Sequence, residues 1–111
     1  MEAPNLSPNA RRVLDELKRA LVSIYGARFK GLYLYGSYAR GEASNNSDID
    51  VMIVLGGDTK PAEEIDRIGE SVAEICLRDD ILISTFPVSE KWYQERQSPL
   101  FINVRREGVL V

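Results

Sequence analysis

Two aspartates separated by one residue, Asp48 and Asp50, follow the pair Gly36-Ser37 after a gap of ten residues. Strand residues two apart point to the same face of a sheet, so the two carboxylates would project together. Such oxygens suit Mg²⁺, which usually binds through one or two carboxylates together with substrate phosphates. A small-residue turn lets backbone N–H groups approach an anion. The combination therefore indicates metal-dependent chemistry on a phosphate.

Each half of this pattern also has an ordinary interpretation. An isolated Asp-x-Asp is usually a turn or a helix cap, and an isolated Gly-Ser after a strand is usually only a turn. Average residue usage gives the conjunction by chance in roughly one chain in a thousand of this length. The chain has no histidine, which excludes Ser-His-Asp and Cys-His catalysis and imidazole zinc sites.

Composition sets the broader limits. The 111 residues are 44% hydrophobic and 28% charged with a net charge of −3, which predicts one globular domain over residues 1–111. The negative charge argues against strong nucleic-acid binding. No apolar run approaches the ~18 residues of a membrane span, and the N-terminal residues lack a signal-peptide pattern. Together with the single Cys76, this predicts a cytoplasmic protein without an intramolecular disulfide.

Helices and strands can be placed from the spacing of apolar residues. Ser7-Pro8 begins a helix that Gly26 ends, and a second long helix begins near Pro61. The expected buried faces are Val13, Leu14, Leu17, Leu21 and Ile24 in the first helix, and Ile65, Ile68, Val72, Ile75 and Cys76 in the second. Residues 37–40 could open a short helix. Ser89 could cap a helical turn, Ser98-Pro99 begins a last helix, and an apolar tail follows Gly108.

Three strands are expected, at 32–35, 49–55 and 81–86, the last bounded by Pro87. The near-continuous apolar run of 49–55 indicates a strand covered on both faces. Met52 and Val54 continue the face of the two aspartates, and Ile49, Val51 and Ile53 lie on the other. The order of elements predicts an α/β (α+β) fold with a small mixed β-sheet flanked by helices.

The segment Gly36-Ser37-x-Ala39-Arg40-Gly41 running to Ser47-Asp48-x-Asp50 resembles the signature of the polymerase β-like nucleotidyltransferase superfamily. It is most similar to the minimal nucleotidyltransferase (MNT) group, and length, element order and the closing segment 105–108 extend the resemblance over nearly the whole chain. The motif itself covers about fifteen residues and is specific. The resemblance implies the polymerase β-like nucleotidyltransferase fold.

By resemblance, the activity is transfer of a nucleoside monophosphate from a nucleoside triphosphate, with ATP the expected donor, to an acceptor hydroxyl. Gly36 and Ser37 would hold the β- and γ-phosphates, and Ser47 is a further phosphate-binding candidate. Asp48 and Asp50 would hold two Mg²⁺ ions. Arg40 could touch the triphosphate or pair with an acid of the loop.

The family also implies a third carboxylate on the following core strand, and here the sequence departs from the pattern. The expected strand 81–86 has no acid, whereas Asp79-Asp80 precede it. Asp80 shares a strand face with Leu82 and Ser84, so it is the candidate for the third catalytic and metal-binding carboxylate. The alternative is that Asp79-Asp80 is only a solvated turn after the helix.

Proteins of the MNT group typically act with a helical HEPN partner, often as antitoxin and toxin, and can attach AMP to it. The resemblance therefore implies a protein hydroxyl as acceptor, a HEPN-type partner and a cytoplasmic toxin–antitoxin role; self-association is left open. Two other interpretations stay open: an antitoxin that acts by contact alone, and a nucleotide-binding regulatory subunit. Tyr33, Tyr35 and Tyr38 could stack on a base, although strand aromatics more often pack in or beside a core.

Overall fold

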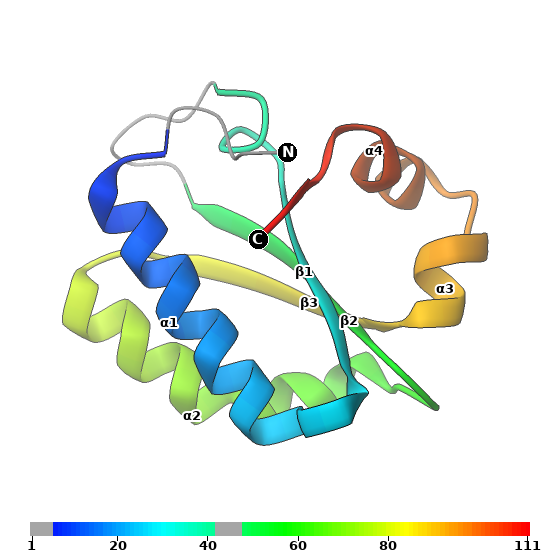
Figure 1. The fold of residues 1–111 in the computed structure, drawn as a ribbon, viewed down its shortest axis with the longest axis horizontal. Coiled ribbons are helices and arrows are strands. Elements are labelled where there is room, and N and C mark those ends of the chain that lie inside the picture. The colour runs from blue at the N-terminus through cyan, green and yellow to red at the C-terminus, as the bar shows by residue number, and fades with distance from the viewer. Residues whose placement is uncertain (1–5, 42–47) are drawn as a thin grey trace.

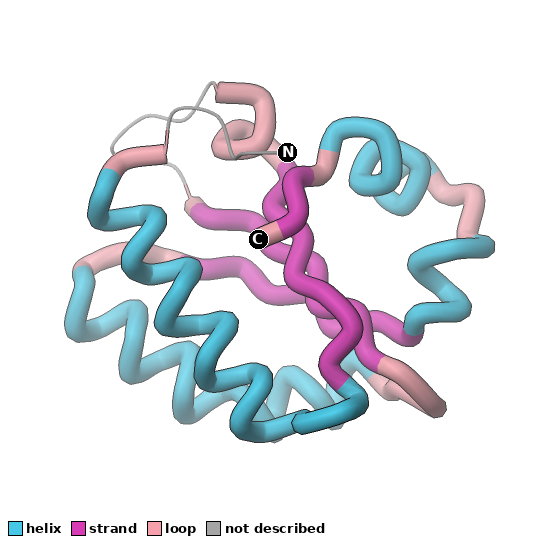
Figure 2. Tube along the Cα trace, viewed as in Figure 1, coloured by secondary structure: helices cyan, strands magenta, loops and turns pink. Residues whose placement is uncertain are grey.

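A four-stranded sheet lies between two pairs of helices in the computed structural model, which describes residues 6–41 and 48–111 (Figures 1 and 2). The elements in chain order are α1 (Pro8–Tyr25), a 3-10 turn η1 (Gly26–Arg28), β1 (Phe29–Tyr35), β2 (Ile49–Leu55), α2 (Pro61–Asp79), β3 (Ile83–Ser89), α3 (Glu90–Glu95), α4 (Pro99–Glu107) and β4 (Val109–Leu110). In the described part of the chain, no helix is both long and apolar enough to cross a membrane.

The sheet is mixed, as the sequence predicts. Its strand order is β3-β2-β1-β4. β1 pairs antiparallel with β2 and with β4, whereas β2 pairs parallel with β3. The apolar tail after Gly108 thus supplies an edge strand, and the parallel pair is joined through α2, because parallel neighbours need a crossover connection.

Central strand β2 is covered on both faces, which confirms the prediction from its apolar run. Its odd-numbered residues pack into a core with α1 and α2, whereas Met52 and Val54 pack into a second core with residues of α3 and α4. Side chains alternate across a strand, so Asp50 belongs to the α3/α4 face. The two layers of helices lie on opposite sides of the sheet in Figure 1.

The third strand differs from the prediction. It runs over Ile83–Ser89 and contains Pro87, so the expected strand 81–86 with Pro87 as its boundary is wrong. The Ile49 N–H donates to the Leu82 carbonyl at 2.9 Å, so even-numbered residues of this strand turn their backbone groups toward β2. Pro87 belongs to the odd-numbered set, which faces the open edge of the sheet. A proline there removes no ladder hydrogen bond.

Helices α1 and α3 begin at predicted side-chain caps, whereas α2 begins after Lys60 and α4 after Ser98 without a side-chain cap. The Ala10 N–H donates to Ser7 Oγ at 3.1 Å, and Gly26 ends α1 with φ of 56°. The Trp92 N–H donates to Ser89 Oγ at 3.0 Å, which confirms the cap before α3. These caps satisfy backbone donors that the first turn of a helix leaves unpaired.

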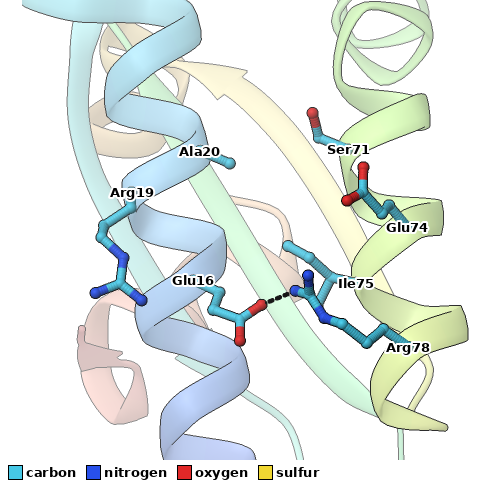
Figure 3. A pocket seen from close by; sticks show the side chains of 7 residues that line it. All are labelled: Glu16, Arg19, Ala20, Ser71, Glu74, Ile75 and Arg78. Carbon is cyan, nitrogen blue, oxygen red and sulfur yellow. Dashed lines mark hydrogen bonds and ion pairs between the residues drawn. The ribbon is translucent and has the colours of Figure 1, made fainter.

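Two predicted core positions are exposed instead. Ile24 of α1 is 37% exposed, and Tyr25 beside it is buried; Ile65 of α2 is 42% exposed. Helices α1 and α2 pack against each other as well as against the sheet. The buried face of each helix is therefore turned toward the other helix, and Ile24 and Ile65 lie at its margin. Figure 3 shows their shared surface, where Glu16 of α1 and Arg78 of α2 point toward each other and form an ion pair.

A buried acid links the start of α2 to the end of α1. Glu64 is 3% exposed, and its Oε1 accepts hydrogen bonds from the Tyr25 hydroxyl at 2.7 Å and from Arg67 at 2.8 Å. Arg28 lies 3.9 Å from its other oxygen. A buried carboxylate is stable only with such partners. Burial and the bond to Glu64 raise the pKa of the Tyr25 hydroxyl.

We expect Glu64→Gln to lower the free energy of unfolding by about 1–3 kcal/mol, because it removes the charge that the two arginines face. The adjacent Glu63 is the matched control: its side chain is 63% exposed and its pair with Lys60 spans 3.9 Å. Glu63→Gln should change stability by less than about 0.5 kcal/mol. Urea unfolding measures both, and equal losses would contradict the assigned role of Glu64.

Candidate active site

The turn after β1 brings Gly36 against one of the two aspartates. Tyr35 pairs with Asp50 in the antiparallel ladder, so the residue that follows Tyr35 lies beside the same carboxylate. Gly36 has φ of 73°, and a Cβ added there would lie 2.6 Å from Asp50 Oδ2. Only glycine allows both this conformation and this close approach. The Gly-Ser turn and the Asp-x-Asp pair, which the sequence links by spacing alone, therefore meet in space.

Residues after Gly36 form a hydrogen-bonded turn and not the short helix expected at 37–40. The Arg40 N–H donates to the Gly36 carbonyl at 3.2 Å, and the Gly41 N–H donates to the Tyr38 carbonyl at 3.3 Å. A second positive φ, 73° at Gly41, ends the turn. Two glycines in this conformation close the segment within a few residues, which prevents helix propagation.

Asp48 and Asp50 differ in their surroundings. Asp48 is exposed just before β2, whereas Asp50 is half-buried within it. Burial raises the pKa of Asp50 above its ordinary value, the charge of Asp48 raises it further, and the cation of Arg40 lowers it. The pKa of the Tyr35 hydroxyl is raised as well, by burial and then by the charge of Asp50. The pair thus holds negative charge that a bound cation would stabilise.

The third carboxylate is not brought to this pair by the described residues. Asp80 is the C-cap of α2, in the left-handed conformation with φ of 50°, exposed and outside β3, which begins at Ile83. Its neighbour Asp79 pairs with Arg12 at 2.8 Å, which ties the end of α2 to the start of α1. Within residues 6–41 and 48–111, no group of three acidic or metal-binding side chains is positioned to hold a metal ion. Ser47 lies outside the described residues.

Ser84 was named from the sequence only as sharing a face with Asp80, and not as a residue beside Asp50. It pairs with Asp50 in the parallel ladder between β2 and β3, so its side chain lies on the same sheet face as that carboxylate. The missed signal is topological: two strands joined by a helix are usually parallel neighbours, so the polar residue inside the second strand can be aligned with the acid in the first.

The remaining aromatic residues pack mainly with one another. Tyr33 stacks on Tyr93 with ring centroids 4.7 Å apart, and Tyr35 and Trp92 pack against the core of the α3/α4 face. Burial and the hydrogen bond with Tyr33 raise the pKa of Tyr93 to about 12. Arg105 donates to the Tyr93 carbonyl at 2.7 Å, which holds α3 against α4.

Comparison with known proteins decides the family. The model of the nucleotidyltransferase domain family matches residues 14–98, which include the Gly-Ser turn, both aspartates and β3. The chain belongs to this family. It is a nucleotidyltransferase of the polymerase β-like superfamily, as the motif predicts, and the family implies a nucleoside triphosphate substrate and the use of metal.

Two relatives come from Methanocaldococcus jannaschii, and each is named a putative protein adenylyltransferase. One is 33% identical over 101 residues, covering 90% of this chain and 95% of the relative. The other is 32% identical over 72 residues, covering 65% of this chain and 72% of the relative. Their names agree with the MNT group that the motif resembles.

A solved structure supports the fold. The crystal structure of a putative nucleotidyltransferase from Sulfolobus solfataricus aligns with a TM-score of 0.54, covering 96% of this chain and 89% of that one. Sequence identity is 17%, so this likeness shows the fold alone. The nucleotidyltransferase thus has the mixed sheet and flanking helices expected from its order of elements.

We expect Gly36→Ala to destabilise the nucleotidyltransferase by about 1–2 kcal/mol more than Gly57→Ala, because only the first must displace a carboxylate. Gly57 is the matched control, with φ of 80° and no atom within 4 Å of an added Cβ. Both substitutions carry a similar backbone cost, about 1 kcal/mol. Urea unfolding measures the stability of both variants and so separates the backbone cost from the cost of displacing Asp50. Equal losses of stability would show that the Asp50 contact contributes nothing.

We also expect Asp50→Asn to stabilise the metal-free protein at neutral pH. Because folding raises the pKa of Asp50, its ionised form favours the unfolded chain, and that cost disappears as the pH falls and the carboxyl is protonated. The advantage of the variant should therefore shrink on acidification. The exposed Asp58→Asn is the control. If Asp50→Asn were less stable than the parent at neutral pH, the predicted stabilisation would be wrong.

Proposed function

We propose that this nucleotidyltransferase transfers AMP from ATP to a hydroxyl group of a partner protein. The observation that carries the proposal is the contact between the Gly36 turn and Asp50, because it sets a phosphate-binding turn beside paired carboxylates. The names of the two relatives support the adenylyl group and the protein acceptor. Residues 1–111 are proposed to act as one minimal domain.

The proposed roles follow from position. Gly36 and Ser37 bind the β- and γ-phosphates through the turn, where small residues leave backbone N–H groups accessible. Asp48 and Asp50 would hold two Mg²⁺ ions; their donor set fits, because both are hard carboxylates and their mutual repulsion favours a cation. Bound Mg²⁺ would neutralise charge on the triphosphate and on the attacking and leaving oxygens. The cation of Arg40 lowers the pKa of Asp50, which supports a place for this cation beside the triphosphate.

In the reaction, the acceptor oxygen forms a bond to the α-phosphorus of ATP while the bond from that phosphorus to the bridging oxygen breaks. Pyrophosphate leaves, and the acceptor proton passes to a base. That base is proposed to be the third carboxylate and not Asp50, because a bound cation would keep Asp50 ionised. Asp80 remains the proposed third carboxylate and Ser47 a proposed phosphate contact.

The partner is proposed to be a helical HEPN-type protein, with the nucleotidyltransferase as antitoxin of the pair. A second candidate is an antitoxin that blocks this partner by contact alone. It is favoured by one observation: no third acidic side chain joins Asp48 and Asp50 among the residues that the structure describes.

Incubation with α-labelled ATP and Mg²⁺ tests the first candidate, with and without the protein encoded by the neighbouring reading frame. We expect Mg²⁺-dependent label on that protein and release of pyrophosphate. Asp48→Asn and Asp50→Asn should each lower labelling by about 100-fold or more. Asp58→Asn, an exposed control, should leave it unchanged. No label with any of the four nucleoside triphosphates, despite a stable complex, would support the contact-only candidate.

Ser84 provides a second test through metal binding. Ser84→Asp would place a third carboxylate on the sheet face of Asp50, so we expect Mn²⁺ affinity to rise on the order of tenfold. Thr85→Asp is the matched control, since the adjacent side chain points to the opposite face. Calorimetric titration with Mn²⁺ in the absence of nucleotide measures both. Equal affinities would exclude a metal site on that face of β2 and β3.

A further inference from the structure

An apolar groove of about 430 Å³ runs between α2 and β3, on the sheet face away from Asp50. Its lining includes Ile65, Val72 and Cys76 of α2, Leu82 just before β3, and Ile83 and Thr85 of β3. Three large side chains around it are solvent-exposed: Ile65 by 42%, Leu82 by 58% and Leu77 by 84%. Exposed apolar surface gathered in one groove is typical of an interaction site.

Beside this groove, β3 has an open edge. Within the described residues it pairs only with β2. Because Leu82 turns its carbonyl to β2, Ile83 and Thr85 turn their backbone N–H and C=O groups outward. The same odd-numbered residues point their side chains toward α2. The run of outward donors ends at Pro87, which has no N–H. An extended chain can therefore pair along Ile83–Thr85 and place alternate side chains in the groove.

Acidic residues of α2 next to the groove favour a partner with basic side chains. Ile65, Gly69, Ala73 and Leu77 form one row of α2 at i, i+4 spacing, and the adjacent row is Asp66, Glu70, Glu74 and Arg78. Asp66 and Glu70 are exposed beside the row that lines the groove, whereas Glu74 and Arg78 lie toward α1, where Arg78 pairs with Glu16, as Figure 3 shows. The groove lining contains no Lys or Arg, so a second copy docked through the same groove would bring no cation from its lining to these acids. A partner with basic side chains beside its apolar ones would be attracted.

We infer that the groove and the open edge of β3 bind an extended segment of a partner protein, with apolar residues at alternate positions and Lys or Arg at its flanks. The segment extends the sheet by one strand next to β3. Its apolar side chains fill the groove over α2, and its basic flanks lie along the row of Asp66 and Glu70.

The position of the docking edge next to Ser84 and Asp50 also bears on the proposed reaction. In an added strand, the side chains between the apolar ones lie on the opposite sheet face, which carries Ser84 and Asp50. A hydroxyl on such a side chain would therefore be held on the face of the candidate active site. This consequence rests on the proposed function, whereas the docking itself does not.

The test uses synthetic peptides of alternating valine and threonine, flanked by lysines in one and by glutamates in the other. We expect the lysine-flanked peptide to slow amide hydrogen exchange at Ile83 and Thr85, and to bind about tenfold more tightly than the glutamate-flanked one. Both are measured on the metal-free and nucleotide-free protein, by NMR. Equal binding of the two peptides, or binding without protection of these amides, would overturn the inference.

Matched variants locate the site. Leu82→Lys should weaken binding of the lysine-flanked peptide by tenfold or more, while Leu110→Lys should not; Leu110 is 56% exposed and lies in β4 at the other edge of the sheet. Ile65→Lys and Val22→Lys form a second pair, since Val22 is 47% exposed on α1. All four positions are exposed, so the variants should fold. Equal effects within either pair would overturn the inference.

Two further results separate this inference from its alternatives. A concentration-dependent dimer by sedimentation, abolished by Leu82→Lys, would assign the groove to a second copy and overturn the proposal. Asp50→Asn should bind the peptide as the parent does, because docking uses the opposite face. Retained peptide binding without any nucleotide transfer would reject the proposed function and leave the docking site intact.

Discussion

The antiparallel register between β1 and β2 is the constraint on which the candidate site depends. It sets Tyr35 opposite Asp50, and so places the Cα of Gly36 against that carboxylate. A shift by one residue would turn Asp50 into the core of the α1/α2 face and move Ile49 and Val51 toward the other. Since β2 is packed on both faces, such a shift would bury a charge in one core and put an apolar side chain at the half-exposed position of Asp50. The core thus fixes the position of the acid.

That position has a cost for the fold. Asp50 is half-buried beside another carboxylate, and both effects raise its pKa. Elsewhere the chain handles buried charge differently, since Glu64 is surrounded by Tyr25 and two arginines. The two environments differ in charge balance: Glu64 is neutralised within the fold, whereas Asp50 lies beside a second carboxylate that raises its pKa further. The candidate site thus departs from the rule that buried charge is paired within the fold, as is common in functional proteins.

Much of this could be predicted from the sequence, because caps and apolar spacing depend on local residues. Ser7, Gly26 and Ser89 mark helix ends correctly, and the run 49–55 gives the central strand with its correct bounds. The bounds of β3 could not be predicted, since a proline usually ends a strand, and only its place at a sheet edge permits Pro87. The nearness of Ser84 to Asp50 was missed because it depends on which strands pair. Asp80 was placed by strand alternation, whereas the structure makes it a helix cap.

Strand β3 joins the candidate active site to the proposed docking groove. Its even-numbered residues bond to β2 and carry Ser84 beside Asp50, and its odd-numbered residues face the groove and the open edge. Among the described residues, β2 is paired on both sides, whereas β3 is hydrogen-bonded to a neighbouring strand on one side only. A segment paired along Ile83–Thr85 would hold it on both sides and thereby restrict Ser84 relative to the aspartates. Docking and the geometry of the site are then linked through a single strand, and binding energy at the groove can contribute to order at the carboxylates.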